Sequence, residues 1–264
     1  MRYEEAVKDL EQTKFFYYLS IKPTQTFLKN KDAEIKIAEQ AFIRAIAQLT
    51  LKNPTLFVKK GRGLACRFLQ RDDTNLIVRE AVGLATEGGH PALAATILEE
   101  NGNFKEAFKI VIKQYQRMVL KKDDRGQLEN QARILLSQDS DESRAPAEKI
   151  EETDKERFRI LQTAAEFGDW YFKRQWTRCD AKVKELQDMM RDYYGHDSGI
   201  RTIFTNVLRM YTFTLVDRFE KEGRGNLALR DYLKNLRKDI EEFATNFKLV
   251  GLRESLNQAQ MRMT

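Results

Sequence analysis

Apolar residues recur every three or four positions along most of this 264-residue chain, which is the spacing of one face of an α-helix. One such series occupies 104–119, at Phe104, Ala107, Phe108, Val111, Ile112, Tyr115, Met118 and Val119. Another occupies 229–247, at Leu229, Leu233, Leu236, Ile240, Phe243 and Phe247. Both segments are predicted to be amphipathic helices that bury one face.

The segment 200–216, IRTIFTNVLRMYTFTLV, is apolar on most sides. Its content of Thr, Ile and Val also allows a strand, but strands usually have about 5–6 residues. A helix at the centre of a bundle therefore fits this segment better. Only 4 Pro and 13 Gly interrupt the chain, so long stretches contain no helix breaker. The predicted fold class is all-α.

One polar segment is the best candidate for a linker between domains. Residues 137–153 are acidic and poor in apolar side chains, so they have little surface to bury. We expect two helical lobes on either side of this linker. Residues 1–136 would form an irregular or solenoid-like lobe, and 154–264 a bundle-like lobe.

Charge is unevenly distributed along the chain, whose formal net charge is +6. No Asp or Glu occurs in 40–71, whereas 137–157 is strongly acidic. This segregation favours a basic surface that faces a partner or the acidic segment. The two cysteines, Cys66 and Cys179, form no C-x-x-C pair, so we expect free thiols in a reducing compartment, cytoplasmic or nuclear, and no metal site.

Other features of the sequence narrow the expected class of protein. No apolar run approaches 18 residues, so no membrane span is expected. The first residues, MRYEEAVKDLEQ, have the pattern of a charged helix and not of a signal peptide. No Ser–His–Asp or Cys–His grouping can be assembled, and no cofactor motif is present. The composition therefore leans away from an enzyme.

The stretch 89–115, GHPALAATILEENGNFKEAFKIVIKQY, resembles one helical hairpin of a tetratricopeptide or clathrin-type α-solenoid. Pro91 suits a first helical turn, and Gly102 suits a left-handed stop between the two helices. The usual tryptophan, glycine and proline positions of such repeats are not filled. The resemblance implies a surface that binds other proteins, and irregular helical packing is the alternative.

A basic stretch at 59–71, KKGRGLACRFLQR, is a candidate for nucleic-acid contact. Its cations are Lys59, Lys60, Arg62, Arg67 and Arg71. Phe57 and Phe68 flank them, and aromatic side chains beside cations suit single-stranded RNA or DNA. The stretch is not a P-loop because it lacks the Gly-Lys-Ser/Thr ending. Alternatively, the phenylalanines are core residues and the charges form a solvated face.

The hexapeptide RDYYGH at 191–196 resembles the short signature of HEPN ribonucleases. Arg191, Asp192 and His196 occupy the matching positions. The resemblance implies a metal-independent endoribonuclease in which two copies meet at a dimer interface. Arg191 would stabilise phosphate charge, and His196 would act in general acid–base catalysis or in positioning. Alternatively, Arg191 is a cation at a helix C-terminus and His196 is a turn residue.

Three functions are therefore compatible with the sequence. The first is a non-enzymatic helical scaffold that docks protein partners and contacts nucleic acid through 59–71. The second is a HEPN-like endoribonuclease that uses Arg191 and His196. The third is a nucleic-acid-coating protein with a basic groove between the two lobes. A homodimer is left open in each case.

Overall fold

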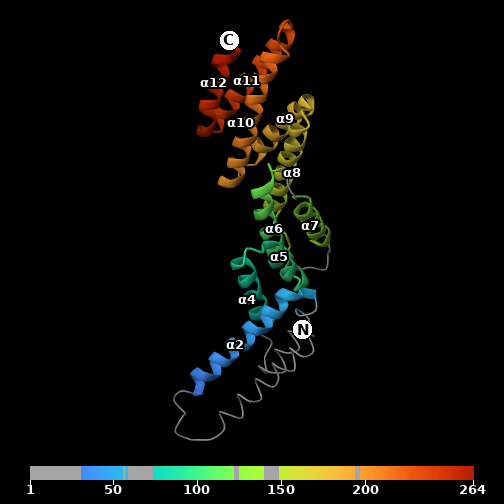
Figure 1. Ribbon diagram of the computed structural model, residues 1–264, viewed down its shortest axis with the longest axis vertical. Helices are drawn as coiled ribbons and strands as arrows, with labels where there is room; N and C mark the ends of the chain where they lie inside the picture. Colours follow the sequence, from blue (N-terminus) through green and yellow to red (C-terminus); the bar gives the residue numbers. More distant parts are fainter. Residues whose placement is uncertain (1–30, 56–57, 59–73, 122–124, 140–148, 194–196) are drawn as a thin grey trace. The chain divides into compact units, whose positions relative to one another are not determined.

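The computed structural model describes residues 31–55, 58, 74–121, 125–139, 149–193 and 197–264 (Figure 1). Within these ranges the regular structure is entirely helical, which confirms the all-α class. The chain divides into two compact units, Met1–Asn103 and Phe104–Thr264.

This division differs from the one expected at a 137–153 linker. Helices α6 (Phe104–Met118) and α7 (Arg125–Asp139) belong to the C-terminal unit, where α6 packs against α7, α8 and α10. Both ends of the expected linker make ordered contacts. The N–H of buried Ile150 donates to the Asp139 carboxylate at 2.7 Å, and Lys155 pairs with the same carboxylate at 3.1 Å. Residues 140–148 lie outside the described residues.

The N-terminal unit is described over three helices, α2 (Lys31–Lys52), α4 (Thr74–Glu87) and α5 (Pro91–Glu100). Helix α4 packs against both α2 and α5. Small residues let the helices approach closely, because Ala81, Ala94 and Ala95 are fully buried beside larger aliphatic side chains. The basic stretch 59–71 belongs to this unit but lies outside the described residues.

The expected turn between α5 and α6 is confirmed. Pro91 is the first residue of α5, and Gly102 has φ 82° after the helix ends. The N–H of Asn103 bonds the Leu98 carbonyl at 2.8 Å, which satisfies an orphan carbonyl of the last turn. The boundary between the two units falls at this turn, inside 89–115. The solenoid resemblance itself stays a prediction.

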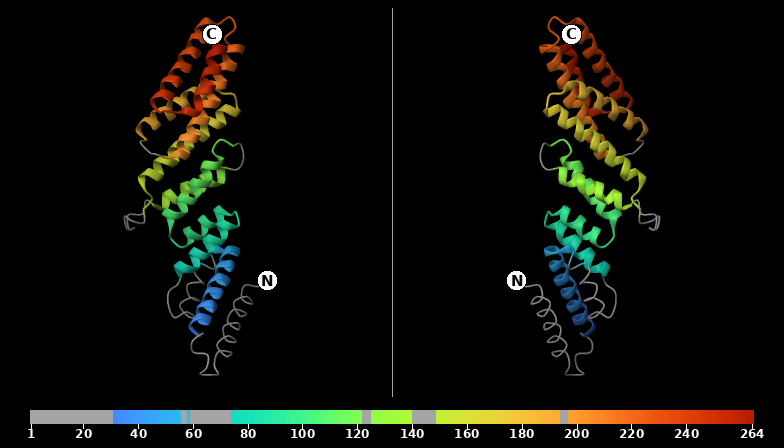
Figure 2. Two further views of the ribbon diagram at one scale, coloured as in Figure 1. Left: turned by 90° about the vertical axis from the view of Figure 1, so that its left-hand side faces the viewer. Right: turned by 90° about the vertical axis from the view of Figure 1, so that its right-hand side faces the viewer.

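The C-terminal unit continues with α8 (Glu152–Phe172), α9 (Trp176–Asp192), α10 (Ser198–Lys221), α11 (Leu227–Asn246), a 3₁₀ turn η3 (Val250–Leu252) and α12 (Arg253–Met263). Helices α8 and α9 form a hairpin, and α11 and α12 pack on each other and on α10 (Figures 1 and 2). Helix α10 contacts α6, α8, α9, α11 and α12. This confirms that 200–216 is a central helix.

Specific caps and a buried arginine fix the ends of these helices. The Asp197 carboxylate accepts hydrogen bonds from the N–H groups of Gly199 and Ile200 and so caps α10. At the start of α7, the buried Arg125 guanidinium donates to the Val119 and Ala165 carbonyls, both at 3.0 Å. It therefore ties α7 to the middle of α8.

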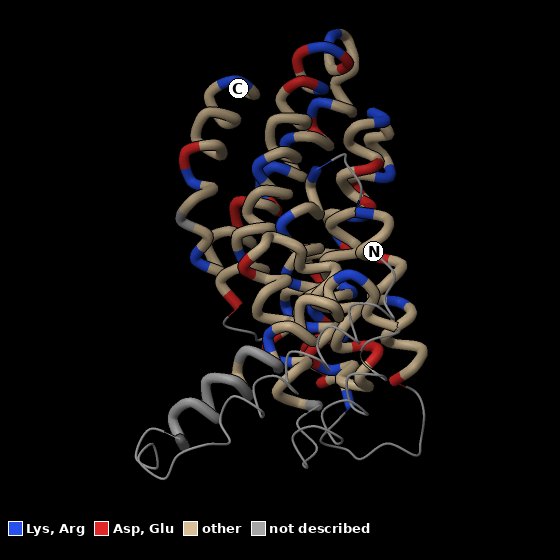
Figure 3. The backbone as a smooth tube through the Cα atoms, turned by 60° about the horizontal axis from the view of Figure 1, so that its bottom comes forward, with Lys and Arg blue, Asp and Glu red and all other residues tan. Residues whose placement is uncertain are grey.

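Cations and carboxylates alternate along most of the described helices (Figure 3). Many are paired along one helix or between neighbours, as in the Arg262–Glu220 pair at 2.7 Å. Among the described residues, no helix combines the length and the apolar character needed to cross a membrane.

Candidate functional site

A groove of about 550 Å³ lies between α9 and α11. Both helices pack against α10. They run in the same direction, since Tyr232 bonds Asp180 at 3.2 Å near their N-terminal ends. Near their C-terminal ends, the Arg191 guanidinium lies 5.9 Å from the centre of the Phe243 ring. The groove is therefore bounded by two parallel helices.

The walls of the groove follow one face of each helix. On α9 the lining includes Thr177, Ala181, Lys184, Asp188 and Arg191. On α11 it includes Tyr232, Leu236, Asp239, Phe243 and Asn246. The spacing of three and four residues continues over about four turns, so each wall is about 21 Å long at 1.5 Å per residue.

The floor of the groove is apolar and its α11 wall is acidic. Val183, Ile240 and Phe243 are buried beneath it, and Leu236 is partly exposed. Asp239 and Glu242 are exposed on α11 and make no ion pair with any described residue. On the opposite wall, Lys184 also has no ion pair within the described part of the chain, whereas Arg191 pairs with Asp188 at 3.1 Å.

A buried polar network closes one end of the groove. The Asp180 carboxylate accepts hydrogen bonds from Tyr211 at 2.7 Å, from Arg218 at 2.9 Å and from Tyr232 at 3.2 Å. The Asp180 and Arg218 side chains are only 11% and 8% exposed. Burial, followed by the nearby Asp180 charge, raises the pKa of the Tyr211 hydroxyl well above its usual value. Asp180 therefore joins α9, α10 and α11.

The structure places two of the three residues of the ribonuclease signature, Arg191 and Asp192, at the C-terminal end of α9. Arg191 lies in the last turn of α9, and its side chain is 62% exposed and lines the groove. His196 lies outside the described residues, so its distance from Arg191 is untested. Lys59, Lys60, Arg62, Arg67 and Arg71 also lie outside the described ranges. The basic groove expected between the two lobes therefore stays a prediction.

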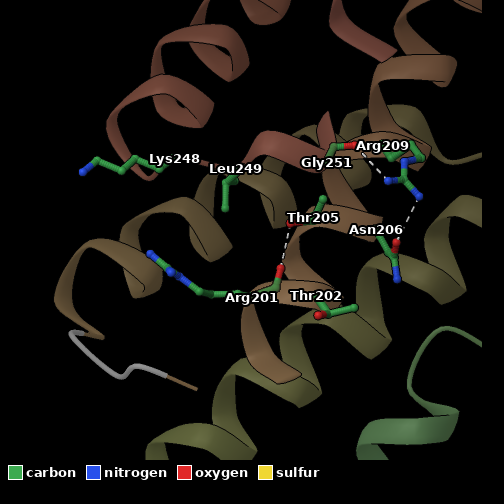
Figure 4. A pocket seen from close by; sticks show the side chains of 8 residues that line it. All are labelled: Arg201, Thr202, Thr205, Asn206, Arg209, Lys248, Leu249 and Gly251. Atoms are coloured by element: carbon green, nitrogen blue, oxygen red, sulfur yellow. Dashed lines mark hydrogen bonds between the residues drawn. The ribbon is translucent and has the colours of Figure 1, made fainter. Parts of the chain in front are cut away.

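A second, smaller pocket of about 290 Å³ is lined by the first half of α10 and the loop after α11 (Figure 4). It contains three cations, Arg201, Arg209 and Lys248. Arg209 donates to the Gly251 carbonyl at 2.9 Å and to the Asn206 side-chain oxygen at 3.4 Å. Within the described part of the chain, no carboxylate lines this pocket.

Apart from Arg191, the residues of these two sites were not among the candidates predicted from the sequence. The signal for the basic pocket was present, because no Asp or Glu occurs from Ser198 to Val216 while Arg201 and Arg209 share a helix face. The groove has no comparable signal, since α10 separates α9 from α11 along the sequence. Nothing in the spacing of residues along one helix shows which other helix will lie beside it.

The surroundings of His90 and Cys179 suit structural roles. His90 is exposed and immediately precedes the first turn of α5. Cys179 is a buried free thiol, and burial with the neighbouring Asp180 charge raises its pKa to about 11. Within the described ranges, no three His, Cys, Asp or Glu side chains are grouped to hold a metal ion.

Comparisons with known proteins leave these sites to be interpreted from their own geometry. No protein-family model matches the sequence, and no curated protein shows significant similarity to it.

Proposed function

We propose that this chain is a non-enzymatic helical interaction protein that docks an amphipathic helix of a partner protein between α9 and α11. The supporting observation is the groove itself, with an apolar floor between two parallel walls of about four turns each. Such grooves accept a helix that places apolar side chains at i, i+3, i+4 and i+7. A helix of about 14 residues matches the length of the walls.

Charge on the two walls specifies the edges of the partner helix. Asp239 and Glu242 favour Lys or Arg on the edge that faces α11. Lys184 favours an acidic residue on the edge that faces α9. Because these rim charges are solvated, they contribute more to specificity than to affinity, and the partly exposed Leu236 offers apolar surface to the partner helix.

Asp180 and Asp188 line the groove and are already paired with neighbouring side chains, which supports a docking role. The carboxylate of Asp180 already accepts hydrogen bonds from Arg218 and two tyrosines. Asp188 holds Arg191. These groups position the walls, and a preorganised groove lowers the entropic cost of binding.

Peptide binding tests this function directly. The probe is a labelled 16-residue amphipathic peptide with Leu on one face and Lys along one edge, compared with the same peptide carrying Glu in place of Lys. We expect the Lys peptide to bind more tightly. The double variant Asp239→Lys and Glu242→Lys should weaken the Lys peptide about tenfold and improve binding of the Glu peptide.

A matched control distinguishes peptide binding in the groove from a nonspecific effect of net charge. Asp231 is exposed on the same helix but does not line the groove. Asp231→Lys should leave both peptides nearly unaffected. Equal weakening by Asp231→Lys, or an absence of binding by either peptide up to millimolar concentration, would overturn the docking proposal.

A metal-independent endoribonuclease is the second candidate. The observation that favours it is the exposed Arg191 at the C-terminal end of a bundle helix, as the HEPN resemblance implies. RNA cleavage that is lost in both Arg191→Ala and His196→Ala would support this candidate over docking.

A further inference from the structure

We propose that one face of α10, together with the loop after α11, binds single-stranded nucleic acid independently of the docking groove. Arg201, Arg209 and Lys248 hold phosphates, and Phe213 stacks against a base. The three cations line the pocket of Figure 4. Phe213 follows Arg209 by one helical turn, so the two residues share a face of α10.

The pocket cations are available to an anion. Arg201 and Arg209 bond only backbone carbonyls and the Asn206 amide, and no ion pair joins either arginine or Lys248 to a described residue. Some other arginines of this unit, such as Arg157, Arg218 and Arg262, instead pair with a carboxylate. A concentration of unpaired cations is the electrostatic footprint of phosphate binding.

Lys248 occupies a backbone conformation that glycine would adopt at lower cost. Its φ is 52°, immediately after the C-cap of α11. The N–H of Leu249 bonds the Ala244 carbonyl at 2.8 Å, completing the turn that usually has Gly at this position. The strained residue thus adds a cation to the pocket. Arg174 has the same conformation after α8, with φ 54°, away from the pocket.

The exposed ring of Phe213 favours a nucleic acid over a simple anion as the ligand of this surface. Its side chain is 46% exposed in the middle of a buried helix, where an aromatic residue would normally contribute to the core. Arg201 and Phe213 are twelve residues apart, or about 18 Å along the helix. Cations that follow a backbone beside an exposed aromatic ring are typical of single-strand binding, because unpaired bases can stack on the ring.

The test is fluorescence anisotropy with labelled 12-nucleotide oligo-U RNA and oligo-dT DNA at about 50 mM salt. It uses the full chain in a Lys59→Ala, Lys60→Ala and Arg62→Ala background, which removes any contribution of these cations. We expect both strands to bind. Arg201→Gln and Lys248→Gly should each reduce affinity and lower the slope of log K against log salt by about 0.7. Phe213→Ala should weaken binding by at least about fivefold.

Two matched variants serve as controls. Arg174→Gly removes a charge from the same type of turn, and Phe172→Ala removes an exposed aromatic ring from α8. Both should bind like the background chain. The proposal is overturned if neither strand binds, if the controls weaken binding as much as the pocket variants, or if base-free polyphosphate competes as tightly as the oligonucleotides. Binding to phosphatidylserine vesicles without oligonucleotide binding would also overturn it.

Discussion

The buried Asp180 network predicts a large loss of stability when its carboxylate is neutralised. In Asp180→Asn, the Arg218 guanidinium keeps its charge but loses its counterion in a site where only 8% of its side chain is exposed. Breaking a buried pair from one side typically costs about 3–5 kcal/mol. The nearest other carboxylate, Glu222, lies 3.8 Å from Arg218 and offsets part of this cost. We therefore expect unfolding free energy to fall by about 3 kcal/mol.

Two further substitutions separate the charge from the hydrogen bonds. Tyr211→Phe removes one donor to Asp180 but leaves Arg218 and Tyr232 in place, so we expect a loss of about 1 kcal/mol. Asp180→Leu combined with Arg218→Met removes both charges together. This double variant should recover part of the stability lost in Asp180→Asn, because no buried charge is left unpaired although the buried Tyr211 hydroxyl loses its acceptor.

Urea unfolding followed by tryptophan fluorescence measures these differences in the relevant unit. The chain contains 2 tryptophans, Trp170 and Trp176, and both lie in the C-terminal unit. The reasoning is refuted if Asp180→Asn costs less than about 1 kcal/mol, or if the double variant is as unstable as the single one. Either result would mean that the ion pair does not hold α9 to α10.

Four other outcomes follow from individual residues. Lys248→Gly should raise the unfolding free energy by about 0.5–1 kcal/mol in the same urea assay, because glycine relieves the left-handed backbone, and a loss of stability would contradict this. In a Cys66→Ser chain, Cys179 should resist a thiol reagent at pH 8 until urea unfolds the protein, since its pKa is raised to about 11; rapid reaction of the folded chain would exclude a buried thiol. The Cys179 thiol ionises at a lower pH in the unfolded chain than in the folded protein. Its contribution to the unfolding free energy should therefore fall as pH rises from about 9 to 11, which urea titrations across that range would measure. Single-stranded RNA should stay intact with the purified chain from pH 6 to 9, with or without metal, whereas cleavage slowed about a hundredfold or more by His196→Ala would establish the ribonuclease instead.

Local patterns in the sequence predicted the helices well. The apolar stripe at 104–119 became α6, and the segment 200–216 became the buried α10 because its apolar residues cover most of its circumference. Gly102 and Pro91 marked the turn and the helix start for reasons of backbone geometry alone. These features depend only on residues close in sequence.

Contacts between residues that are far apart in the sequence could not be predicted in the same way. Asp180 and Arg218 are 38 positions apart, and each resembles any other charged residue of a helical face until α9 and α10 pack together. The boundary expected at 137–153 came from composition, whereas the compact units divide at the short turn that ends at Asn103. The composition of a segment indicates how strongly it is solvated, but it does not show which helices pack together in one core.

The most direct measurement of docking is methyl NMR of the full chain titrated with the Lys-edged amphipathic peptide. Leu236 and Ile240 report on the groove, whereas Leu227 and Met261, both 72% exposed, report on apolar surface elsewhere in the same unit. We expect saturable shifts at Leu236 and Ile240, with Leu227 and Met261 unchanged, and loss of these shifts in the Asp239→Lys and Glu242→Lys variant. Shifts centred on Leu227 or Met261, with Leu236 and Ile240 unaffected, would show that the groove between α9 and α11 is not a docking site.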